Sequence, residues 1–489
     1  MRGIVRGAAS GVLAAGFGIA IAELLAAATR PLAGPLVAVG GAVIDATPTP
    51  IKEFAVRELG TYDKPVLLAS IALVLVVLTA VIGVLARRGP GYAVTGAAVL
   101  GAAGAAAAAT RPAATAYDVV PSLVGAALAG VVLIALSRRF APPRDRRAFL
   151  RAAALLAAGA VLAGTGSGVV RRTAGRSRGS VRLPAPADPA PAFAAPSGFV
   201  TPNAGFYRVD TALAVPRIDL GTWSLKIHGM VERSAELSFE DLLNRPLIER
   251  DITLNCVSNE VGGRYIGTAR WLGVPLAPLL RELGIRPGAD QVVARSAEGM
   301  TIGTPVGTVL DGRDTMLCVG MNGEPLPLEH GFPVRMLTPG LYGYAGACKW
   351  LIELELTTFA EFDAYWVWRG WAARGPVKTA SRIDKPQPFA AVAPGTVTVA
   401  GVAWAQRRGI KRVEVQVDSG AWAEADLLPV PSTDTWVQWR YGWTATPGPH
   451  SLRVRATDGT GAVQTEGRAT PFPDGATGWH TITVTAGRG

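Results

Sequence analysis

The feature that most constrains this chain is a series of long apolar runs confined to its first 172 residues. A helix that crosses a bilayer needs about 20 mostly apolar residues. The runs that approach this length are Val12–Ala28, Pro65–Ala86, Tyr92–Thr110, Pro121–Ser137 and Phe149–Val170. The run Leu36–Ile44 is shorter, and we expect it to be re-entrant or interfacial. Residues 1–172 are therefore predicted to form an α-helical transmembrane bundle of about five helices.

The charge of the chain follows the same division. The formal net charge is +11, and residues 1–172 hold 17 Lys and Arg residues against seven Asp and Glu residues, a difference of +10. Short arginine-rich loops between apolar runs obey the positive-inside rule, by which cytoplasmic loops keep their basic residues. We therefore attribute the charge to membrane topology, and we expect no nucleic-acid partner.

The arginines between the apolar runs also predict the direction of insertion. The residues that we place on the cytoplasmic side are Arg2, Arg6, Arg87, Arg88, Arg138, Arg139, Arg144, Arg146 and Arg147. Because five spans carry the chain across the membrane an odd number of times, everything after residue 172 is predicted to be extracytoplasmic. The protein is thus expected to be a multi-pass protein of the cell membrane.

The fifth run has a second interpretation. It begins "RRAFLRAAALLAAGAVLAG", in which the twin arginine at Arg146 and Arg147 precedes a modest apolar core. This pattern resembles a twin-arginine translocation signal, although ordinary positive-inside flanking gives the same residues. A signal of that kind predicts that the following domain is exported already folded, as proteins loaded with a cofactor in the cytoplasm usually are.

Two further features of the apolar region bear on function. Residues 1–172 contain no His and no Cys, which argues against a haem held by axial histidine ligands within the spans. Glu23 lies inside the first span, and a carboxylate there is a functional candidate by default. A contact with another helix explains Glu23 equally well.

The rest of the chain divides into three parts. Residues 173–200 are rich in Pro, Ala, Arg and Ser and read as a semi-extended linker. Residues 201–386 interleave strand-like and helix-like runs, which predicts an α+β domain. Residues 387–489 show short alternating runs with turns between them, which predicts a β-sandwich.

The segment "TLNCVSNEVGG", Thr253 to Gly263, places a cysteine at the end of an extended run. Cys256 is one of only three cysteines, and no CxxC, HxxxH or CxxCH occurs, so the patterns of structural zinc, iron–sulfur and covalent haem sites are absent. A Cys–His nucleophile with His228 or His330, and a buried inert thiol, both stay open. Whether Cys318 and Cys348 form a disulfide cannot be read from their spacing.

Two long motifs carry a resemblance to a known family. They are "TLNCVSNEVGG…TARWLGVPLAPLL" and, further along, "MNGEPLPLEHGFPVRMLTPGLYGYAGACKW". Together they resemble the sulfite-oxidase family of molybdopterin-dependent oxidoreductases, in a membrane-anchored bacterial type. The resemblance covers residues 201–386 as the molybdopterin-binding catalytic domain, and residues 387–489 match the family's immunoglobulin-like dimerisation domain, which implies a homodimer.

The resemblance implies a role for each matching residue. Cys256 would be the thiolate ligand of molybdenum beside the dithiolene of one pyranopterin, so the implied cofactor is molybdenum–molybdopterin. Arg335, Lys349 and His330 match positions that hold the pterin phosphate and its surroundings, and Arg208 would also touch the substrate. The other residues implied to bind the cofactor are Phe206, Tyr207, Ser296, Gly346 and Ala347.

The sequence departs from the family beside the implied ligand. Glu260 occupies part of a region that is arginine-rich in sulfite oxidases, and "YWVWRGWAARGPVKTASRID" lacks the family's pocket tyrosine. Arg208, Arg369 and Arg374 remain candidate contacts for an anion. Because an attached haem domain is missing from the match, we expect a separate electron-transfer partner that is a cytochrome or linked to quinone. The predicted activity is oxygen-atom transfer on a small substrate; the alternatives are a sulfoxide or N-oxide reductase and a metal-free scaffold.

Overall fold

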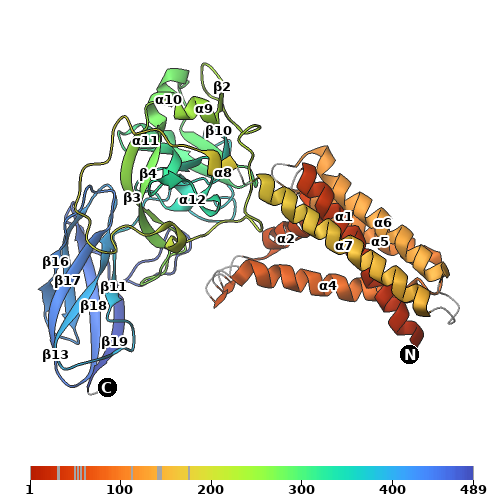
Figure 1. Ribbon diagram of the computed structural model, residues 1–489. Helices are drawn as coiled ribbons and strands as arrows, with labels where there is room; N and C mark the ends of the chain where they lie inside the picture. Colours follow the sequence, from red (N-terminus) through yellow and green to blue (C-terminus); the bar gives the residue numbers. More distant parts are fainter. Residues whose placement is uncertain are drawn as a thin grey trace. The chain divides into compact units, whose positions relative to one another are not determined.

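Figure 1 shows the computed structural model of the protein. It describes residues 2–29, 33–48, 51, 54–55, 58–59, 62–111, 114–139, 146–174 and 177–487. The chain divides into two compact units. One comprises Met1–Ser177 together with Asp210–Asp219, and the other comprises Arg178–Val209 and Leu220–Gly489.

The first unit is helical. Its main helices are α1 (Arg2–Thr29), α2 (Pro35–Ala46), α4 (Asp63–Leu85), α5 (Pro90–Ala109), α6 (Val120–Arg139) and α7 (Arg146–Ala174). Helix α1 packs against α4, α6 and α7, while α5 packs against α2 and α6. Within the described residues, four helical segments are long and apolar enough to cross a membrane, namely Gly3–Thr29, Lys64–Leu85, Pro90–Ala109 and Ala116–Arg138.

The fifth expected span, Phe149–Val170, differs from the prediction. It lies within α7, whose 29 residues include an apolar stretch of only Leu150–Thr165, because arginines occur near both ends of the helix. This apolar stretch is shorter than the apolar segments of the four helices that are long enough to cross a membrane. Arg144, one of the predicted cytoplasmic residues, lies outside the described residues.

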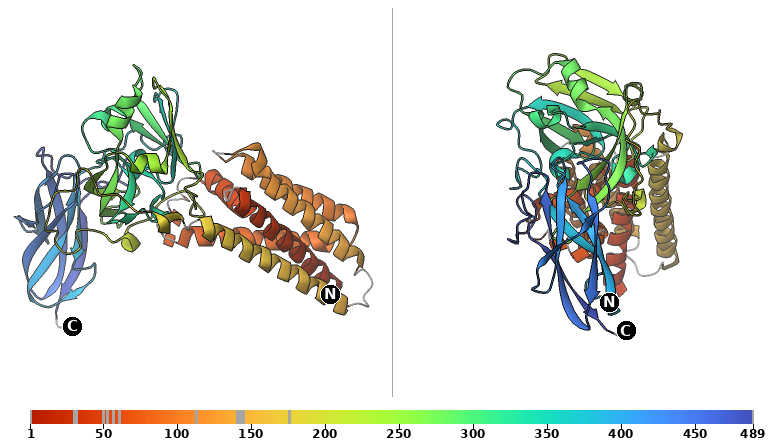
Figure 2. Two further views of the ribbon diagram at one scale, coloured as in Figure 1. Left: turned by 45° about the horizontal axis from the view of Figure 1, so that its top comes forward. Right: turned by 90° about the vertical axis from the view of Figure 1, so that its left-hand side faces the viewer.

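Helix α7 nevertheless belongs to the bundle. It runs alongside α1 in Figure 1 and in the left view of Figure 2. A Cβ atom at Gly159 of α7 would lie 3.1 Å from the Phe17 ring of α1. Helix α2 has 12 residues and is about 18 Å long at 1.5 Å per residue, too short to cross a bilayer. The backbone N–H of Leu36 in α2 donates to the Glu23 carboxylate at 3.2 Å, so Glu23 partners a neighbouring helix.

Small residues bring the helix backbones into close contact. A Cβ atom at Gly11 of α1 would lie 1.9 Å from the Thr79 carbonyl oxygen of α4. Likewise, a Cβ atom at Gly18 would lie 2.3 Å from the Gly125 carbonyl oxygen of α6. Interhelical packing in membranes depends on such close approach, since burial from water contributes little there. The Ala and Gly content of the apolar runs therefore serves helix packing.

A short segment that follows the helices in the sequence also belongs to the helical unit. Residues Asp210–Asp219 cluster with it, and Asp210 forms an ion pair with Lys64 at 2.5 Å. Leu213 lies against Gly40 of α2. The segment follows directly on Phe206–Arg208, so the chain that carries these predicted site residues continues into the helical unit.

The second unit begins with an α+β domain of two sheets. The first sheet has the order β2-β1-β10-β5-β6, in which only β1 and β10 pair in parallel. Its strands are β1 (Ser224–Gly229), β2 (Ala235–Ser238), β5 (Gln291–Ser296), β6 (Thr301–Pro305) and β10 (Leu351–Thr357). The second has the order β3-β4-β7-β8, with β9 also paired to β7. Its strands are β3 (Ile248–Asn255), β4 (Ile266–Pro275), β7 (Met316–Met321), β8 (Glu324–Pro325) and β9 (Arg335–Leu337).

Short helices precede or connect these strands. They are α8 (Ser177–Ser180), α9 (Phe239–Leu243), α10 (Leu276–Leu283), α11 (Val306–Leu310) and α12 (Gly343–Gly346), with the 3-10 turns η4 (Asn203–Gly205) and η5 (Leu328–His330). Helix α10 places Leu276, Leu279, Leu280 and Leu283 in the core, which is the i, i+3, i+4, i+7 pattern of an amphipathic helix.

The C-terminal part contains two further sheets that share one core. Their orders are β11-β13-β17-β16 and β12-β19-β18-β14-β15. The strands are β11 (Ala380–Lys385), β12 (Ala391–Val392), β13 (Gly395–Trp404), β14 (Ile410–Val417), β15 (Trp422–Glu424), β16 (Asp426–Leu427), β17 (Val437–Ala445), β18 (Gly448–Asp458) and β19 (His480–Ala486). Trp439 and Trp443 fill this core with aliphatic residues of both sheets. The immunoglobulin-like assignment and the homodimer through residues 387–489 stay predictions.

The C-terminal sheets hold the strand that precedes Cys256. Thr253 of β3 donates its N–H to the Asp434 carbonyl oxygen at 3.0 Å, and its hydroxyl oxygen accepts from the Trp436 N–H at 2.7 Å. The Gln406 amide donates to the Thr253 carbonyl oxygen at 3.2 Å. Strand β3 is therefore fixed by β4 on one side and by distant segments of the chain on the other.

Candidate active site

Cys256 lies at the end of β3, on a rigidly held backbone. Its N–H donates to the Tyr265 carbonyl oxygen at 2.9 Å, and its own carbonyl oxygen accepts from the Asn259 N–H at 3.1 Å. The Asn259 side chain closes the same loop, because its amide oxygen accepts from the Tyr265 N–H at 2.8 Å. The Cys256 side chain is buried, at 9% exposed. A buried thiol on such a backbone is held in one position.

The surroundings of the Cys256 thiol affect its pKa in opposite directions. Burial raises the pKa of the thiol above its usual range, whereas hydrogen bonds from Ser258 and the positive charge of Lys349 act in the opposite direction. A cation that binds to the sulfur would favour the thiolate further. The thiol is therefore suited to a metal ligand more than to a free nucleophile at neutral pH.

The stretch before Asp210 brings two aromatic rings to this region. Phe206 is buried, stacks on Tyr207 with ring centroids 5.2 Å apart, and meets the Trp271 ring edge-on at 5.8 Å. Gly267 of β4 makes room for it, since a Cβ atom there would lie 2.9 Å from the Phe206 ring. Desolvation raises the pKa of the Tyr207 phenol, the Cys256 sulfur adds to the rise, and the charge of Arg335 lowers it.

His330 is buried at the end of η5, and one of its ring nitrogens forms a hydrogen bond. Its Nε2 lies 3.0 Å from the Asn203 carbonyl oxygen, and its ring meets that of Phe206 edge-on at 5.5 Å. Burial lowers the pKa of His330 to about 4, so the ring is neutral at pH 7. Because a carbonyl oxygen only accepts, Nε2 carries the proton and Nδ1 is an acceptor. Within the described residues, Nδ1 has no hydrogen-bond partner.

Two cations belong to the same group of residues. Arg335 is only 5% exposed, lies over the Trp271 ring at 5.4 Å, and donates to the His330 carbonyl oxygen at 3.4 Å. Lys349 donates to the Glu329 carbonyl oxygen at 3.3 Å and lies over the Trp350 ring. Gly331 lets these two segments approach, since a Cβ atom there would lie 3.0 Å from the Lys349 Cα atom.

The remaining predicted residues have mainly structural contacts. Gly346 ends α12, and a Cβ atom there would lie 2.9 Å from the Leu341 Cβ atom, so packing within the protein requires glycine. Ala347 follows as the C-cap and donates its N–H to the Gly343 carbonyl oxygen at 2.9 Å. Ser296 ends β5, where its hydroxyl oxygen accepts from the Glu298 N–H at 3.3 Å and shapes a turn.

The structure therefore connects most of the predicted set. Phe206, Tyr207, His330 and Arg335 form a chain of ring and charge contacts, and the thiol of Cys256 interacts electrostatically with Tyr207 and Lys349. Arg208 is half-buried beside Tyr207. For Ser296, Gly346 and Ala347, the contacts described above are to neighbouring backbone rather than to Cys256.

The donor set fits an anionic, metal-binding cofactor. It combines a buried thiol with a buried guanidinium group, a second cation and a buried imidazole acceptor. Asn255, beside Cys256, also has a buried side-chain oxygen without a partner among the described residues. Buried polar atoms are almost always paired in native proteins, so such atoms at one place indicate a ligand. A thiolate is a soft metal ligand, and a guanidinium group suits a phosphate.

Several residues that position this group were not identified from the sequence. Asn322, in a turn with φ of 51°, donates to the Thr201 carbonyl oxygen at 3.0 Å and to the Asn203 side-chain oxygen at 2.8 Å. Trp271 lies under both Phe206 and Arg335. An Asn-Gly pair between two strands is a turn signal that could have drawn attention to Asn322, but nothing in the sequence pairs it with residues 119 or more positions away.

Two of the candidate anion contacts, Arg369 and Arg374, lie over aromatic rings of their own segment of the chain. The Arg369 guanidinium group lies 3.5 Å from the centroid of the Tyr365 ring, and that of Arg374 lies 5.7 Å from the centroid of the Phe359 ring. Glu260 is exposed on the loop after Cys256. Its carbonyl oxygen closes a turn by accepting from the Gly263 N–H at 2.8 Å.

Among the described residues, the other cysteines form no disulfide, and His228 belongs to a separate group with Glu353 and Glu355. Cys256, Cys318 and Cys348 are all free, so Cys318 and Cys348 do not pair in this structure. Burial raises the pKa of the Cys318 and Cys348 thiols, which disfavours the thiolate form of both. His228 bonds to Glu353 at 2.9 Å, in a network with Arg295, and this partner explains it without a role beside Cys256.

Comparison with known proteins identifies the central domain. Residues 212–366 match the family model of the oxidoreductase molybdopterin binding domain. The chain is 33% identical to mitochondrial sulfite oxidase of Mus musculus over 275 residues, which cover 47% of this chain and 50% of that protein. It is 37% identical to nitrate reductase [NADH] 1 of Oryza sativa subsp. japonica over 196 residues, or 35% of this chain and 21% of that protein.

The same domains are similar in structure to a solved protein. The sulfane dehydrogenase SoxCD from Paracoccus pantotrophus superposes with a TM-score of 0.52 at 24% identity, over 60% of this chain and 85% of that one. This similarity concerns the fold. The chain spans about half the length of the mammalian sulfite oxidases that it matches.

These findings, with the donor set described above, assign the chain's central domain. It is an oxidoreductase molybdopterin binding domain that is similar to parts of sulfite oxidase and nitrate reductase, which implies molybdenum–molybdopterin as its cofactor.

Proposed function

We propose that this protein is a membrane-anchored enzyme that moves an oxygen atom to or from a small substrate at a molybdenum centre. The proposal extends the molybdopterin-binding domain at residues 212–366 to the whole chain. The bound cofactor supplies the two-electron oxygen-atom transfer, and the protein binds, orients and shields the reactants. Electrons pass to or from a partner that is separate from this domain.

In this proposal Cys256 is the protein's ligand to molybdenum. Its position at the end of β3, with its N–H and carbonyl oxygen both hydrogen-bonded, supports the assignment because a metal ligand must be held rigidly. Hydrogen bonds from Ser258 and the charge of Lys349 lower the pKa of the thiol against the larger effect of burial. The pKa of the free thiol is raised by burial, so metal binding and proton loss are coupled.

The surrounding residues hold the organic part of the cofactor. Arg335 and Lys349 supply positive charge for the phosphate, and the His330 Nδ1 atom accepts a hydrogen bond. Phe206 and Tyr207 give an aromatic wall, while Arg208 is assigned to the substrate side. Ser296, Gly346 and Ala347 act by shaping the backbone of the site. The single observation that carries the proposal is the buried group of Cys256, Arg335 and His330 inside a molybdopterin-binding domain.

The helical unit is assigned to the cell membrane. Four apolar segments of sufficient length support anchoring. We propose that α7 is a fifth crossing, because it packs along α1, and that the catalytic domain is extracytoplasmic after export by a twin-arginine route. The homodimer through residues 387–489 is part of the same proposal.

The substrate is proposed to be a small oxygen-atom donor or acceptor. One observation favours reduction of a neutral S-oxide or N-oxide over oxidation of sulfite. The loop after Cys256 carries the exposed carboxylate of Glu260, which repels an anion that approaches along this loop. The ligand set permits both directions.

Two measurements on the purified full-length protein test the proposal. Elemental analysis should find about one molybdenum per chain, and a screen with dyes as electron donors or acceptors should find turnover in one direction. Sulfite and neutral sulfoxides should be tested side by side. Absence of molybdenum from protein that was produced with cofactor supply would support the metal-free scaffold instead.

A further inference from the structure

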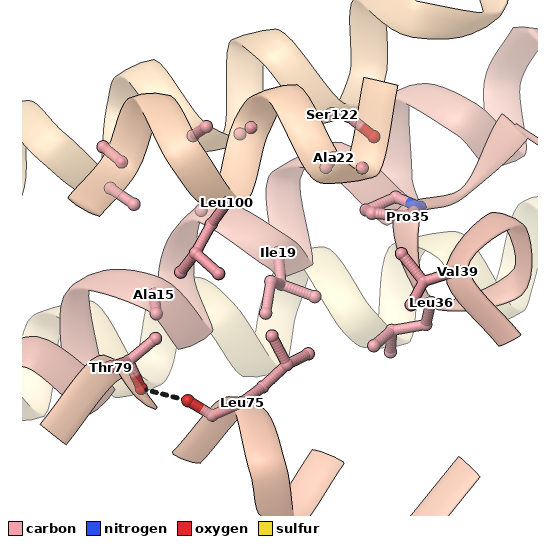
Figure 3. A pocket seen from close by; sticks show the side chains of 17 residues that line it. Ala15, Ile19, Ala22, Pro35, Leu36, Val39, Leu75, Thr79, Leu100 and Ser122 are labelled. Carbon is pink, nitrogen blue, oxygen red and sulfur yellow. Dashed lines mark hydrogen bonds between the residues drawn. The ribbon is translucent and has the colours of Figure 1, made fainter. Parts of the chain in front are cut away.

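The helical unit contains an apolar cavity that the proposed function does not use. It has a volume of about 100 Å³ and lies between α1, α2, α4, α5 and α6. Figure 3 shows Ile19, Leu36, Val39, Leu75 and Leu100 around it, and small residues such as Ala22 complete its wall. No charged side chain lines this cavity among the described residues.

The volume of the cavity limits what can occupy it. A cavity of about 150 Å³ in a protein core binds a benzene molecule and stays free of water when its lining is apolar. The cavity between these helices is somewhat smaller, so at most one six-membered ring fits inside it. Pockets for drug-sized ligands are several times larger, at about 300–1,000 Å³.

One polar group in the lining is available for a ligand. The Ser122 side chain at the start of α6 is only 5% exposed, and its hydroxyl has no hydrogen-bond partner among the described residues. By contrast, the Thr79 hydroxyl donates to the Leu75 carbonyl oxygen at 2.7 Å, as Figure 3 shows. An unpaired buried hydroxyl costs free energy, and a ligand with an acceptor oxygen recovers it. The cavity therefore fits an uncharged ring that carries a carbonyl oxygen.

We propose that this cavity binds the ring of a membrane-soluble quinone, the electron-transfer partner of the molybdenum domain. This inference rests on the proposed function, which requires a separate carrier. Residues 1–172 contain no His and no Cys, so the unit lacks the usual axial ligands of a haem and the thiolates of an iron–sulfur cluster. A quinone needs neither. Its two carbonyl oxygens and apolar ring match the Ser122 hydroxyl and the aliphatic wall.

The electron balance of this scheme closes. In the oxidising direction, the oxygen atom that the substrate gains comes from water, and two electrons and two protons leave. One quinone takes up both electrons and both protons and becomes its quinol. In the reducing direction, a quinol gives up the same two electrons and two protons, and the oxygen atom leaves the substrate as water.

The main alternative occupant is an acyl chain of a membrane lipid. Such a chain satisfies the apolar wall, but it has no acceptor for the Ser122 hydroxyl. A quinone ring satisfies both. The two occupants therefore respond differently to a change at Ser122, and this difference provides the test.

Photolabelling of the full-length protein in lipid nanodiscs tests the proposal. The probe is an azido-substituted benzoquinone, and the labelled peptide is identified by mass spectrometry. We expect saturable labelling of residues that line the cavity, which decylubiquinone displaces and excess phospholipid does not. Ala97→Phe fills the cavity and should reduce labelling at least tenfold, whereas Ala102→Phe, on an exposed position of the same helix, should leave it unchanged.

Ser122→Ala provides a milder variant that should fold normally. Loss of one hydrogen bond should weaken the displacement by decylubiquinone about fivefold. Thr79→Val is the matched control, because the Thr79 hydroxyl already has a partner, and it should change displacement less than twofold. Labelling away from the residues that line the cavity, equal labelling in Ala97→Phe and Ala102→Phe, unchanged displacement in Ser122→Ala, or displacement by phospholipid would each overturn the proposal.

A variant without the molybdenum ligand separates this inference from the proposed function. Cys256→Ala should lose turnover and keep the quinone labelling, because the cavity lies in the other unit of the chain. Turnover with dyes together with absent labelling would refute the quinone site alone. Labelling together with absent molybdenum in the unchanged protein would refute the proposed function alone.

Discussion

Replacement of Gly262 by alanine tests how the C-terminal sheets support the Cys256 loop. Gly262 has φ of 80°, and a Cβ atom there would lie 2.3 Å from Nε2 of His480 in β19. The His480 ring cannot easily retreat, because its Nδ1 atom accepts from the Ile383 N–H at 3.0 Å. Arg382, the neighbour of Ile383, donates to the Gly263 carbonyl oxygen at 2.6 Å. The substitution therefore pushes against a hydrogen-bonded contact.

The magnitude follows from two separate costs. A non-glycine residue in the left-handed region costs about 1 kcal/mol, and overpacking of a rigid contact costs about 1–3 kcal/mol. We therefore expect Gly262→Ala to lower the free energy of unfolding by about 2–4 kcal/mol. Gly312→Ala is the matched control. Gly312 has φ of 89°, and a Cβ atom there would meet no atom within 4 Å, so only the backbone cost of about 1 kcal/mol applies.

The assay is thermal unfolding of the full-length protein in detergent, with molybdenum content measured on the same samples. A change of 1 kcal/mol corresponds to about 2–4 °C for a domain of this size. The Tm should fall by about 4–16 °C in Gly262→Ala and by about 2–4 °C in Gly312→Ala, and only the first should lose molybdenum. Equal decreases in the two variants, with molybdenum retained in both, would refute the idea that the C-terminal sheets position the loop.

Three further predictions concern the site and its setting. Burial and the charge of Arg382 lower the pKa of His480 to about 4 in the folded protein, so the unfolded state binds more protons between about pH 6.5 and pH 4. The free energy of unfolding should therefore fall by about 2–3 kcal/mol as the pH drops through this window. In a series of melting curves at different pH, His480→Gln should flatten this dependence. Arg335→Gln should reduce the molybdopterin content at least tenfold while the fold persists, because a buried cation for the phosphate is lost; an unchanged pterin content, measured by fluorescence after oxidation, would contradict the assignment. Replacing Arg146 and Arg147 by lysine should leave the catalytic domain inaccessible to protease added outside intact cells, and normal accessibility would show that export does not use the twin arginine.

The prediction of the site from the sequence rests on local signals. Cys256 follows an extended run, and the strand β3 ends at Asn255 as expected. The motif around His330 and Arg335 likewise forms one tight group with Lys349, because Gly331 permits close approach of the two segments. A cysteine at a strand end and glycines at close contacts are visible in the sequence itself.

What could not be predicted depends on contacts between distant segments. The hydrogen bond between Trp436 and Thr253 joins residues 183 positions apart, and that between His330 and Asn203 joins residues 127 positions apart. Neither has a periodic or spacing signal. The fifth membrane span also stays a prediction, because the run Phe149–Val170 is apolar overall but its continuous apolar stretch among the described residues is only Leu150–Thr165.

The central claim is that the sulfur atom of Cys256 binds molybdenum. X-ray absorption spectroscopy at the molybdenum edge, on the purified full-length protein and on Cys256→Ser, tests it most directly. The account predicts that the variant keeps its pterin and loses one sulfur neighbour of the metal. An unchanged number of sulfur neighbours in Cys256→Ser would contradict it.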